Sequence, residues 1–393
     1  MPRSQFSFGH KAIPVLSPTL FVKIPQEATH ALIRLVTTTM VTNLDTDASV
    51  TKGYVFQEER GIANAAVNYF SKRSDLKPML YSTEEMEKAT DSFNEILVLG
   101  NWKGRQGTVY KGMLSDGSIM AIKKSNRVGE DQVGRFINEV LFLSQINHRN
   151  IVRLLGGCLE HEVPLLVYEF VSNGTLSYHL RNEKHVPKLS WENRLRTAGE
   201  VAGALAYLQS CASMAIYHRD IKSDNILLDE NYRAVVSDLG LSSYSGWRHF
   251  GYLDPRYFRS GQFTDKSDVY PFGVVLAELL TGRGAISSSS SDEGLVFHFK
   301  ASMKRNRLFE VLDTLVVDEG LEEEILAVAK LAQRCLNMIA KKRPVMKEVA
   351  AILDQLRRIR AKSAYYFHRS SRAILLISES ACSYTNNTIN EGS

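Results

Sequence analysis

The chain has 393 residues, of which 44% are hydrophobic and 23% are charged, a balance that is ordinary for folded proteins. The net charge of +5 is mild, and because no basic patch is interleaved with aromatic residues, nucleic acid is not expected as a partner. The four cysteines are scattered without a CxxC pair or a metal-ligand spacing, so we expect reduced thiols rather than a disulfide framework.

The first 78 residues show neither a clear helical or strand period nor a motif, and we expect a poorly ordered extension there. Two apolar runs fall in this part. The run at residues 12–22 is broken by two prolines, and the run at residues 31–41 is interrupted by Arg34 and too short to span a membrane. We therefore expect no transmembrane segment in this chain.

Residues 79–94 contain the capping box S-T-E-E at residues 82–85, which predicts a short helix ending near Phe93. From residue 95 to residue 170 we expect mostly strands and one helix. That helix is predicted by apolar residues spaced by three and four, namely Val133, Phe136, Val140, Leu143 and Ile146. Glu139 lies beside this apolar stripe.

Two segments before that helix carry glycines and a lysine. Residues 99–109 read L-G-N-W-K-G-R-Q-G-T-V, and glycines of this kind let bare backbone approach phosphate groups. Residues 119–123 read I-M-A-I-K, a strand-like run that ends in Lys123.

The remainder of the chain reads as mainly helical, over residues 171–358, followed by a tail at residues 359–393. A helix from Trp191 to Cys211 is predicted by core positions at helical spacing, namely Leu195, Ala198, Val201, Leu205 and Leu208. Pro344 opens the last predicted helix, whose inward positions are Val345, Val349, Ile352, Leu353 and Leu356.

The most informative stretch lies between these helices. Residues 217–225 read Y-H-R-D-I-K-S-D-N, which is the H-R-D-x-K-x-x-N signature of a protein-kinase catalytic loop. With this spacing Asp220 accepts the proton of an attacking hydroxyl, and Lys222 places a cation where negative charge develops. Asn225 and Asp238, the latter in the D-L-G triplet, would hold magnesium on the phosphates of ATP.

The residues from about 81 to 356 resemble the kinase domain of plant receptor-like kinases, most closely the wall-associated subgroup. The runs that carry the resemblance are E-E-M-E-K-A-T at 84–90, G-T-V-Y-K-G at 107–112, I-N-H-R-N-I-V at 146–152, P-L-L-V-Y-E-F at 164–170, G-Y-L-D-P at 251–255 and K-K-R-P at 341–344. The resemblance implies an α+β, bilobal protein-kinase fold over residues 95–358. Its small, β-rich lobe would span residues 95–170, and its larger, mainly helical lobe residues 171–358.

The same resemblance implies transfer of the γ-phosphoryl group of ATP, bound with Mg²⁺, to serine and threonine hydroxyls of protein substrates. Lys123 would grip the α and β phosphates and pair with Glu139, and Tyr168 would guard the back of the adenine pocket. The residues assigned to ATP binding are Gly104, Gly107, Val109, Ala121, Lys123, Tyr168, Glu169, Val171 and Leu227. Other receptor-like kinases would be partners, in the cytoplasm or at the cytoplasmic face of the plasma membrane.

Several positions depart from the family pattern. Trp102 stands at the first glycine position of the phosphate-binding loop, and Gly100 can replace that glycine only if the loop holds two extra residues. The activation segment from Asp238 to Asp254 lacks about ten residues relative to the pattern, by comparison with the kinase template. The regulatory residues that remain are Arg219, Ser242, Ser243 and Ser245.

Two further departures concern packing. Arg256 replaces the Glu that would pair with Arg343, so either the two arginines repel each other, or Arg256 turns out to solvent and Arg343 finds another carboxylate. Pro271 lies within or just past the first turn of a helix, where its missing N–H is cheap or costs about 3 kcal/mol respectively.

These departures leave two functional classes open. The first is an enzyme whose activity is reduced by the altered loop and the short activation segment. The alternative is a catalytically impaired kinase-fold scaffold that binds nucleotide or partner kinases. Both a shortened cytoplasmic member and a part of a longer receptor stay open.

Overall fold

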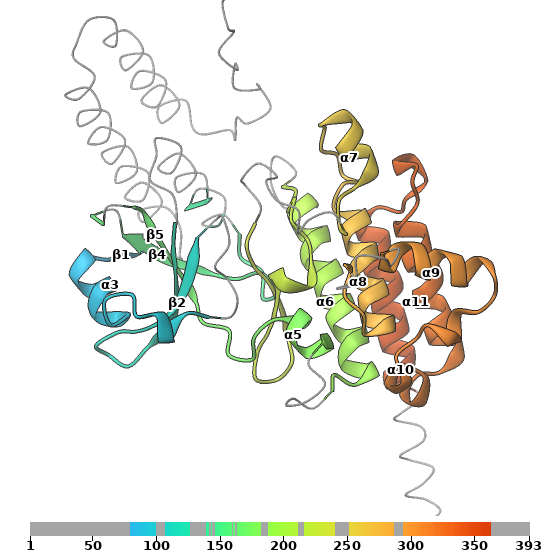
Figure 1. Ribbon diagram of the computed structural model, residues 1–393, viewed down its shortest axis with the longest axis horizontal. Coiled ribbons are helices and arrows are strands. Elements are labelled where there is room, and N and C mark those ends of the chain that lie inside the picture. The colour runs from blue at the N-terminus through green and yellow to red at the C-terminus, as the bar shows by residue number, and fades with distance from the viewer. Residues whose placement is uncertain are drawn as a thin grey trace, which may run out of the picture. The chain divides into compact units, whose positions relative to one another are not determined.

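The computed structural model describes residues 79–99, 107–125, 139–140, 143, 146–158, 160–161, 163–181, 188–210, 216–239, 251–286 and 294–362. The expectations for residues 1–78 and for most of the tail lie outside these ranges. Within them the chain has the predicted α+β architecture, a five-stranded sheet followed by a mainly helical part (Figure 1). No helix in the described ranges is both long and apolar enough to cross a membrane.

The five-stranded sheet has the order β1-β4-β5-β3-β2. Its strands are β1 (Met79–Leu80), β2 (Thr108–Met113), β3 (Ile119–Lys124), β4 (Leu154–Cys158) and β5 (Leu165–Glu169). All neighbouring pairs are antiparallel except β1 and β4, which run parallel. Since β1 precedes the predicted start of the small lobe, the segment at residues 79–94 adds an edge strand to the sheet.

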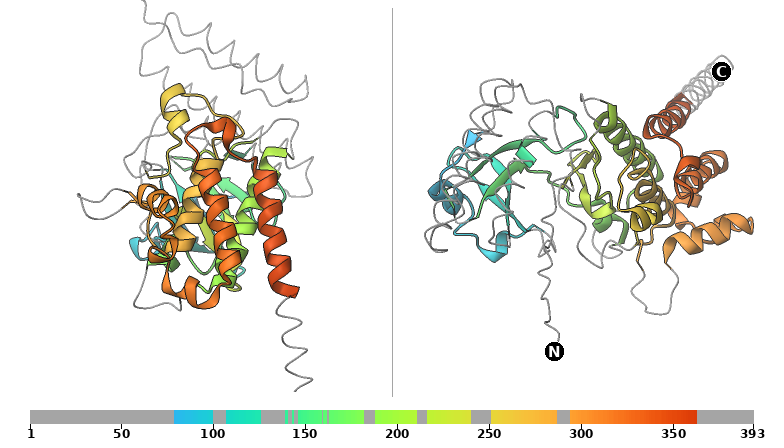
Figure 2. Two further views of the ribbon diagram at one scale, coloured as in Figure 1. Left: turned by 90° about the vertical axis from the view of Figure 1, so that its right-hand side faces the viewer. Right: turned by 90° about the horizontal axis from the view of Figure 1, so that it is seen from above.

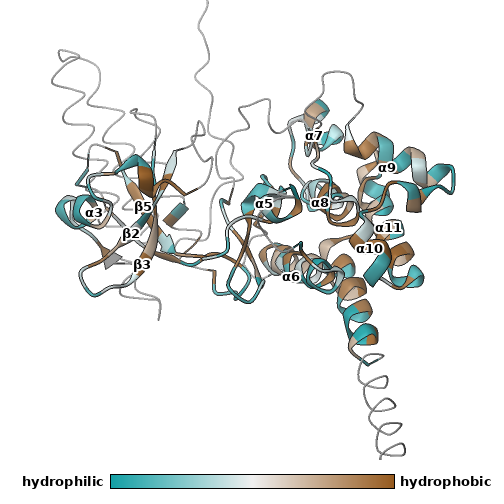
Figure 3. Ribbon diagram, turned by 60° about the horizontal axis from the view of Figure 1, so that its bottom comes forward, coloured by the Kyte–Doolittle hydropathy of each residue, from teal (hydrophilic) through white to brown (hydrophobic). Residues whose placement is uncertain are grey.

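The helix α3 (Thr83–Ala89) begins with the predicted capping box. Ser82 N donates to Glu85 Oε2 at 2.7 Å, and Glu85 N donates to Ser82 Oγ at 3.1 Å. The helix ends at Ala89, four residues before the predicted end at Phe93, because Asp91, Ser92 and Phe93 all have a positive φ. Figure 3 shows α3 as largely hydrophilic, whereas β5 is hydrophobic, and Met86 is the α3 residue that is fully buried.

The mainly helical part contains α5 (Leu176–Arg181), α6 (Trp191–Ser210), α7 (Pro255–Ser260), α8 (Val269–Thr281), α9 (Leu295–Lys304), α10 (Thr314–Glu319) and α11 (Glu322–Cys335). It also holds the two-stranded sheet of β6 (Ile226–Leu228) and β7 (Ala234–Val236). Short 3₁₀ turns complete the described elements, namely η2 (Glu95–Leu97), η3 (Ser223–Asn225), η5 (Leu308–Glu310) and η6 (Ala340–Lys342). Residues 346–362 form the last helix, drawn in red in Figure 2.

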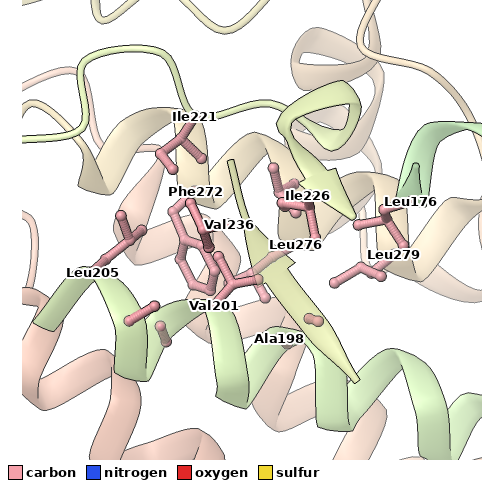
Figure 4. Packing of buried hydrophobic residues seen from close by; sticks show 14 of the residues in the cluster. Leu176, Ala198, Val201, Leu205, Ile221, Ile226, Val236, Phe272, Leu276 and Leu279 are labelled. Atoms are coloured by element: carbon pink, nitrogen blue, oxygen red, sulfur yellow. The ribbon is translucent and has the colours of Figure 1, made fainter. Parts of the chain in front are cut away.

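The central element of this part is α8, in which every residue is buried. It packs against α6, α9 and α11. The five core positions predicted on α6 are all buried, and Figure 4 shows Val201 and Leu205 grouped with Phe272 and Leu276 of α8. The helical spacing in the sequence therefore identified the core face of α6 correctly.

The starts of α8 and of the last helix test two expectations from the sequence. Pro271 is the third residue of α8, within the first turn, where a backbone N–H has no partner inside the helix in any case. In the last helix Val349 and Leu353 are fully buried as predicted, but Val345 is 40% exposed. Val345 was predicted wrongly because it precedes the first helical residue.

Candidate active site

Lys123 at the end of β3 lies between two carboxylates. Its Nζ is 2.7 Å from Asp238 Oδ1 and 3.4 Å from Glu139 Oε1. β3 brings the lysine from the sheet, residue 139 is helical, and Asp238 follows β7 in the other part of the molecule. Three residues predicted from separate motifs therefore meet in one place.

The surroundings of Lys123 determine its charge. Burial by itself disfavours the ammonium form, but the carboxylates of Asp238 and Glu139 outweigh it and raise the pKa of Lys123. Lys123 therefore keeps its positive charge at neutral pH, which is the form that can bind phosphate oxygens.

Tyr168, on the neighbouring strand β5, contacts this group through Glu139. Its hydroxyl donates a hydrogen bond to Glu139 Oε1. Burial, together with the negative charge of Glu139, raises the pKa of Tyr168 far above its ordinary value, so the phenol stays neutral and remains a donor. The guarding role that the resemblance assigns to Tyr168 stays a prediction.

The catalytic-loop residues form a second cluster around Asp220. Lys222 Nζ lies 2.7 Å from Asp220 Oδ2. Asn225 Nδ2 donates to the carbonyl oxygen of Asp220 at 2.7 Å and to its Oδ2 at 3.0 Å. The asparagine thus binds both the backbone and the side chain of Asp220, and the η3 turn that ends at Asn225 sets this geometry.

The side-chain oxygen of Asn225 is a further feature of this cluster. This Oδ1 atom is buried and has no hydrogen-bond partner among the described residues. A buried amide oxygen without a donor is uncommon, and it is suited to a hard cation such as Mg²⁺. With the Asp238 carboxylate as a further oxygen ligand, these two residues fit the metal that the motif implies.

Asp268, which precedes α8, holds the backbone of the catalytic loop. Its two carboxylate oxygens accept hydrogen bonds from His218 N and Arg219 N, both at 2.9 Å. Arg219 has a φ of 67°, a conformation that is unfavourable for a residue with a side chain and needs such support. Sequence reasoning missed this role, although an acidic residue directly before a largely apolar helix was a signal for it.

His218 anchors the same loop through its ring. Its Nε2 lies 3.0 Å from the carbonyl oxygen of Ser237, and its Nδ1 accepts from Asp220 N at 3.3 Å. Burial lowers the pKa of His218, even though the carboxylates of Asp268 and Asp220 act in the opposite direction. The neutral ring, with one donor and one acceptor nitrogen, matches these two contacts.

The ATP-binding residues predicted from the resemblance are placed in part. Gly107 has a φ of 147°, and a Cβ added there would lie 2.5 Å from the carbonyl oxygen of Lys124, so this position requires glycine. Ala121, Val171 and Leu227 are partly buried against the main core, and Glu169 accepts from Arg153 N at 3.0 Å. Val109 pairs with Lys123 across β2 and β3. Trp102 and Gly104 lie outside the described residues.

The regulatory set is described for one member. Ser242, Ser243 and Ser245 lie outside the described ranges. The guanidinium of Arg219 lies over the ring of Phe263, 5.1 Å from its centroid, and its Nε is buried without a hydrogen-bond partner in the described part of the chain.

Arg343 and Arg256 do not face each other. Arg343 Nη2 is 2.6 Å from Asp254 Oδ1, and Arg256 Nη1 donates to Thr264 Oγ1 at 3.2 Å. The repulsion considered from the sequence is therefore wrong. Arg343 finds another carboxylate, as the alternative predicted, but Arg256 is half-buried and bonded to Thr264 and does not turn out to solvent.

Comparison with known proteins agrees with this geometry. Residues 98–353 match the family described as protein tyrosine and serine/threonine kinase. Wall-associated receptor kinase-like 4 of Arabidopsis thaliana is 54% identical over 298 residues, which cover 72% of this chain and 39% of that protein. Wall-associated receptor kinase-like 1 of the same plant is 53% identical over 71% of this chain and 40% of its own length. The chain spans about two fifths of the length of these relatives.

Proposed function

Because this chain belongs to the protein tyrosine and serine/threonine kinase family, we propose that it is an active kinase that phosphorylates serine and threonine hydroxyls of proteins. The observation that carries the proposal is the presence of two clusters, one in which Lys123 pairs with Asp238 and one in which Lys222 and Asn225 bind Asp220. No charged member of this machinery is replaced. A kinase that has lost catalysis would be expected to lack one of them.

In the proposed reaction each residue has a defined task. Asp220 accepts the proton of the substrate hydroxyl as the oxygen attacks the γ-phosphoryl group. Lys222, already 2.7 Å from Asp220, stabilises the negative charge that develops beside it. Lys123, kept cationic by its two carboxylates, positions the phosphates of ATP.

Two oxygen ligands from the chain itself would hold the metal. Asn225 Oδ1 and the Asp238 carboxylate would hold Mg²⁺, which supplies charge neutralisation on the phosphates. Asn225 also keeps Asp220 oriented through its Nδ2, so one side chain serves the metal and the base.

The names of the relatives support a proposal about the cellular role of this activity. Their printed names describe receptor kinases, and we extend to this chain a role in receptor-like kinase signalling, with other receptor-like kinases as partners at the cytoplasmic face of the plasma membrane. Serine/threonine specificity is part of the proposal and rests on the resemblance to plant receptor-like kinases.

The rival proposal is a kinase-fold scaffold with impaired catalysis. It draws on Trp102 and on the short activation segment. The third departure, Arg256, no longer supports it, because Arg343 has Asp254 as its partner.

The two proposals are separated by labelled-phosphate transfer from ATP with Mg²⁺, by the full chain, onto itself and onto a generic basic protein. The control is Asp220→Asn, which keeps the fold and removes the base. We expect label on serine and threonine with the wild type and none with the control. Folded wild-type protein that binds ATP but transfers no label would establish the scaffold instead.

A further inference from the structure

Three arginines from separate segments surround one buried carboxylate in the mainly helical part of the molecule. They are Arg149, in the turn before β4, Arg196 of α6 and Arg357 of the last helix, and we call them the arginine cluster. The carboxylate is that of Glu200 on α6, whose Oε2 accepts a hydrogen bond from Ala234 N at 2.7 Å. The proposed reaction uses none of these residues.

The geometry of α6 brings two of the arginines to Glu200. Arg196 lies one helical turn before Glu200, so the two side chains share a face of the helix. A Cβ added at Gly199 would lie 3.0 Å from Arg357 Cδ and 3.3 Å from its Nη1. A Cβ added at Gly203, one turn further on, would meet no neighbouring atom within 4 Å. Arg357 therefore lies against α6 directly beside Glu200.

Arg149 reaches the same place through the first residue of β7. Its Nε donates to Asn150 Oδ1 at 3.4 Å, and Asn150 Nδ2 donates to the carbonyl oxygen of Ala234 at 2.7 Å. The N–H of the same alanine donates to Glu200. Hydrogen bonds to one residue thus place Arg149 and Glu200 at the same end of β7.

The charge of the arginine cluster is not neutralised by contact within the described part of the chain. Arg149 and Arg196 bind an amide oxygen and a carbonyl oxygen there, and neither they nor Arg357 form an ion pair with a described carboxylate. Arg196 Nε is buried without a hydrogen-bond partner in these ranges. Other arginines of the same helix and of β7's turn do form ion pairs, namely Arg233 with Asp229, Arg358 with Asp354 and Arg360 with Glu324.

Glu200 does not cancel this positive charge. Burial raises the pKa of Glu200, and the three arginines, which act in the opposite direction, do not outweigh burial. Even with Glu200 ionised, three guanidinium groups and one carboxylate leave an excess of two positive charges. A phosphate monoester carries about −1.5 to −2 charges at neutral pH, and guanidinium groups bind its oxygens through paired hydrogen bonds. The charge of the cluster therefore matches one phosphate monoester.

We propose that the arginine cluster binds the phosphate group of a phosphorylated protein segment. A membrane surface would need a broad, exposed basic face, whereas Glu200 is buried, Arg196 and Arg357 are half-buried, and Arg358 and Arg360 are already paired. A single phosphorylated side chain is small enough to enter such a recessed site. This role goes beyond the proposed function, because it does not require the chain to transfer phosphate.

The test measures binding to the full chain while a non-hydrolysable ATP analogue and Mg²⁺ occupy the nucleotide site. The probes are a short phosphoserine peptide, its unphosphorylated form, and phosphatidylcholine vesicles that contain phosphatidic acid, a lipid phosphate monoester. We expect the phosphoserine peptide to bind and the unphosphorylated peptide not to bind. Inorganic phosphate should compete with the bound peptide.

Substitutions then locate the site. Arg149→Gln and Arg357→Gln should each weaken binding of the phosphoserine peptide about tenfold, the ratio expected when one hydrogen bond between charged groups is lost. The matched control is Arg358→Gln, which removes the same charge at the adjacent, 77% exposed position of the last helix and should change the affinity less than about twofold. Thermal unfolding checks that each variant is folded.

Glu200→Gln gives the specific signature, because it should strengthen binding. The amide oxygen still accepts from Ala234 N, but the negative charge beside the arginines is gone. The affinity for the phosphoserine peptide should rise about threefold, the size of one charge–charge interaction through water. A cluster with a purely structural role predicts no gain in any variant.

Several results would overturn the proposal. They are no binding of the phosphoserine peptide, binding of inorganic phosphate alone, and an equal loss in Arg358→Gln, which indicates non-specific attraction. Binding of the vesicles without binding of the peptide would assign the cluster to a lipid headgroup instead. Wild-type protein that binds the peptide but transfers no phosphate would overturn only the proposed function.

Discussion

Arg343 and Asp254 form a buried ion pair, with 2.6 Å between Nη2 and Oδ1 and both side chains almost fully shielded from solvent. Arg343 follows the η6 turn, and Asp254 is the N-cap of α7, where its Oδ1 also accepts from Arg256 N at 2.9 Å. The carbonyl oxygens of Asn337 and Lys266 accept hydrogen bonds from Arg343 Nε and Nη1, respectively. One aspartate therefore both caps a helix and neutralises the arginine that the family pairs with a glutamate.

This pair predicts a strong effect of Asp254→Asn. The amide keeps a cap acceptor but removes the charge opposite Arg343, and breaking a buried pair costs about 3–5 kcal/mol. The free energy of unfolding in urea should fall by that amount. The matched variant is Arg256→Ala, which removes a single hydrogen bond to Thr264 and should cost less than about 1 kcal/mol. Equal losses in the two variants would contradict the assignment of Asp254 as the partner.

The burial of Met86 predicts that the segment before the matched kinase region packs into the core beside the sheet. Its side chain is fully buried, in a cluster with Met120, Ile122 and Val167. Met86→Ala should lower the free energy of unfolding by about 2–5 kcal/mol. Glu87→Ala, at the neighbouring exposed position, should change it by less than about 0.5 kcal/mol. A loss for Met86→Ala as small as that for Glu87→Ala would show that α3 is not part of the cooperative unit.

Pro271 and Gly273 lie two positions apart on α8, and we expect substitution by alanine to be tolerated at Pro271 but not at Gly273. Pro271→Ala should change the free energy of unfolding by less than about 1 kcal/mol, since the missing N–H falls in the first turn. Gly273→Ala should cost about 1–3 kcal/mol, because its Cβ would lie 2.8 Å from Cys335 Cβ on α11. Chemical denaturation of both variants measures the difference, and the reverse order would contradict the packing of α8 on α11.

The lowered pKa of His218 predicts that the free energy of unfolding falls on mild acidification. Burial lowers the pKa of His218 in the folded protein, so below its ordinary value of about 6.5 the unfolded chain takes up a proton that the folded ring does not. The contribution of His218 to the free energy of unfolding is therefore fully present above about pH 6.5 and decreases as the pH falls further. Thermal unfolding between about pH 7 and pH 5 should show this slope, and His218→Phe should reduce it. An identical slope in the variant would exclude His218 as its source.

The sequence alone identified the family and predicted the reacting groups, because the chemistry depends on short spacings. Asp220, Lys222 and Asn225 fall within six positions, so the order of residue types already predicted a turn that gathers them around one carboxylate. The capping box at Ser82 and the core face of α6 were predicted for the same reason, since both depend on neighbours three or four positions apart.

The partners that hold these groups in place were decided by tertiary structure. Asp268 lies 50 positions after His218, Arg343 lies 89 positions after Asp254, and Glu278 lies 55 positions after Ser223. Spacings of this length carry no period, and a buried carboxylate in an apolar helix reads in sequence like any other acidic residue. Only the packing of α8 against the neighbouring segments shows which donors reach this carboxylate, because most buried polar groups take their partners from whatever segments lie nearby.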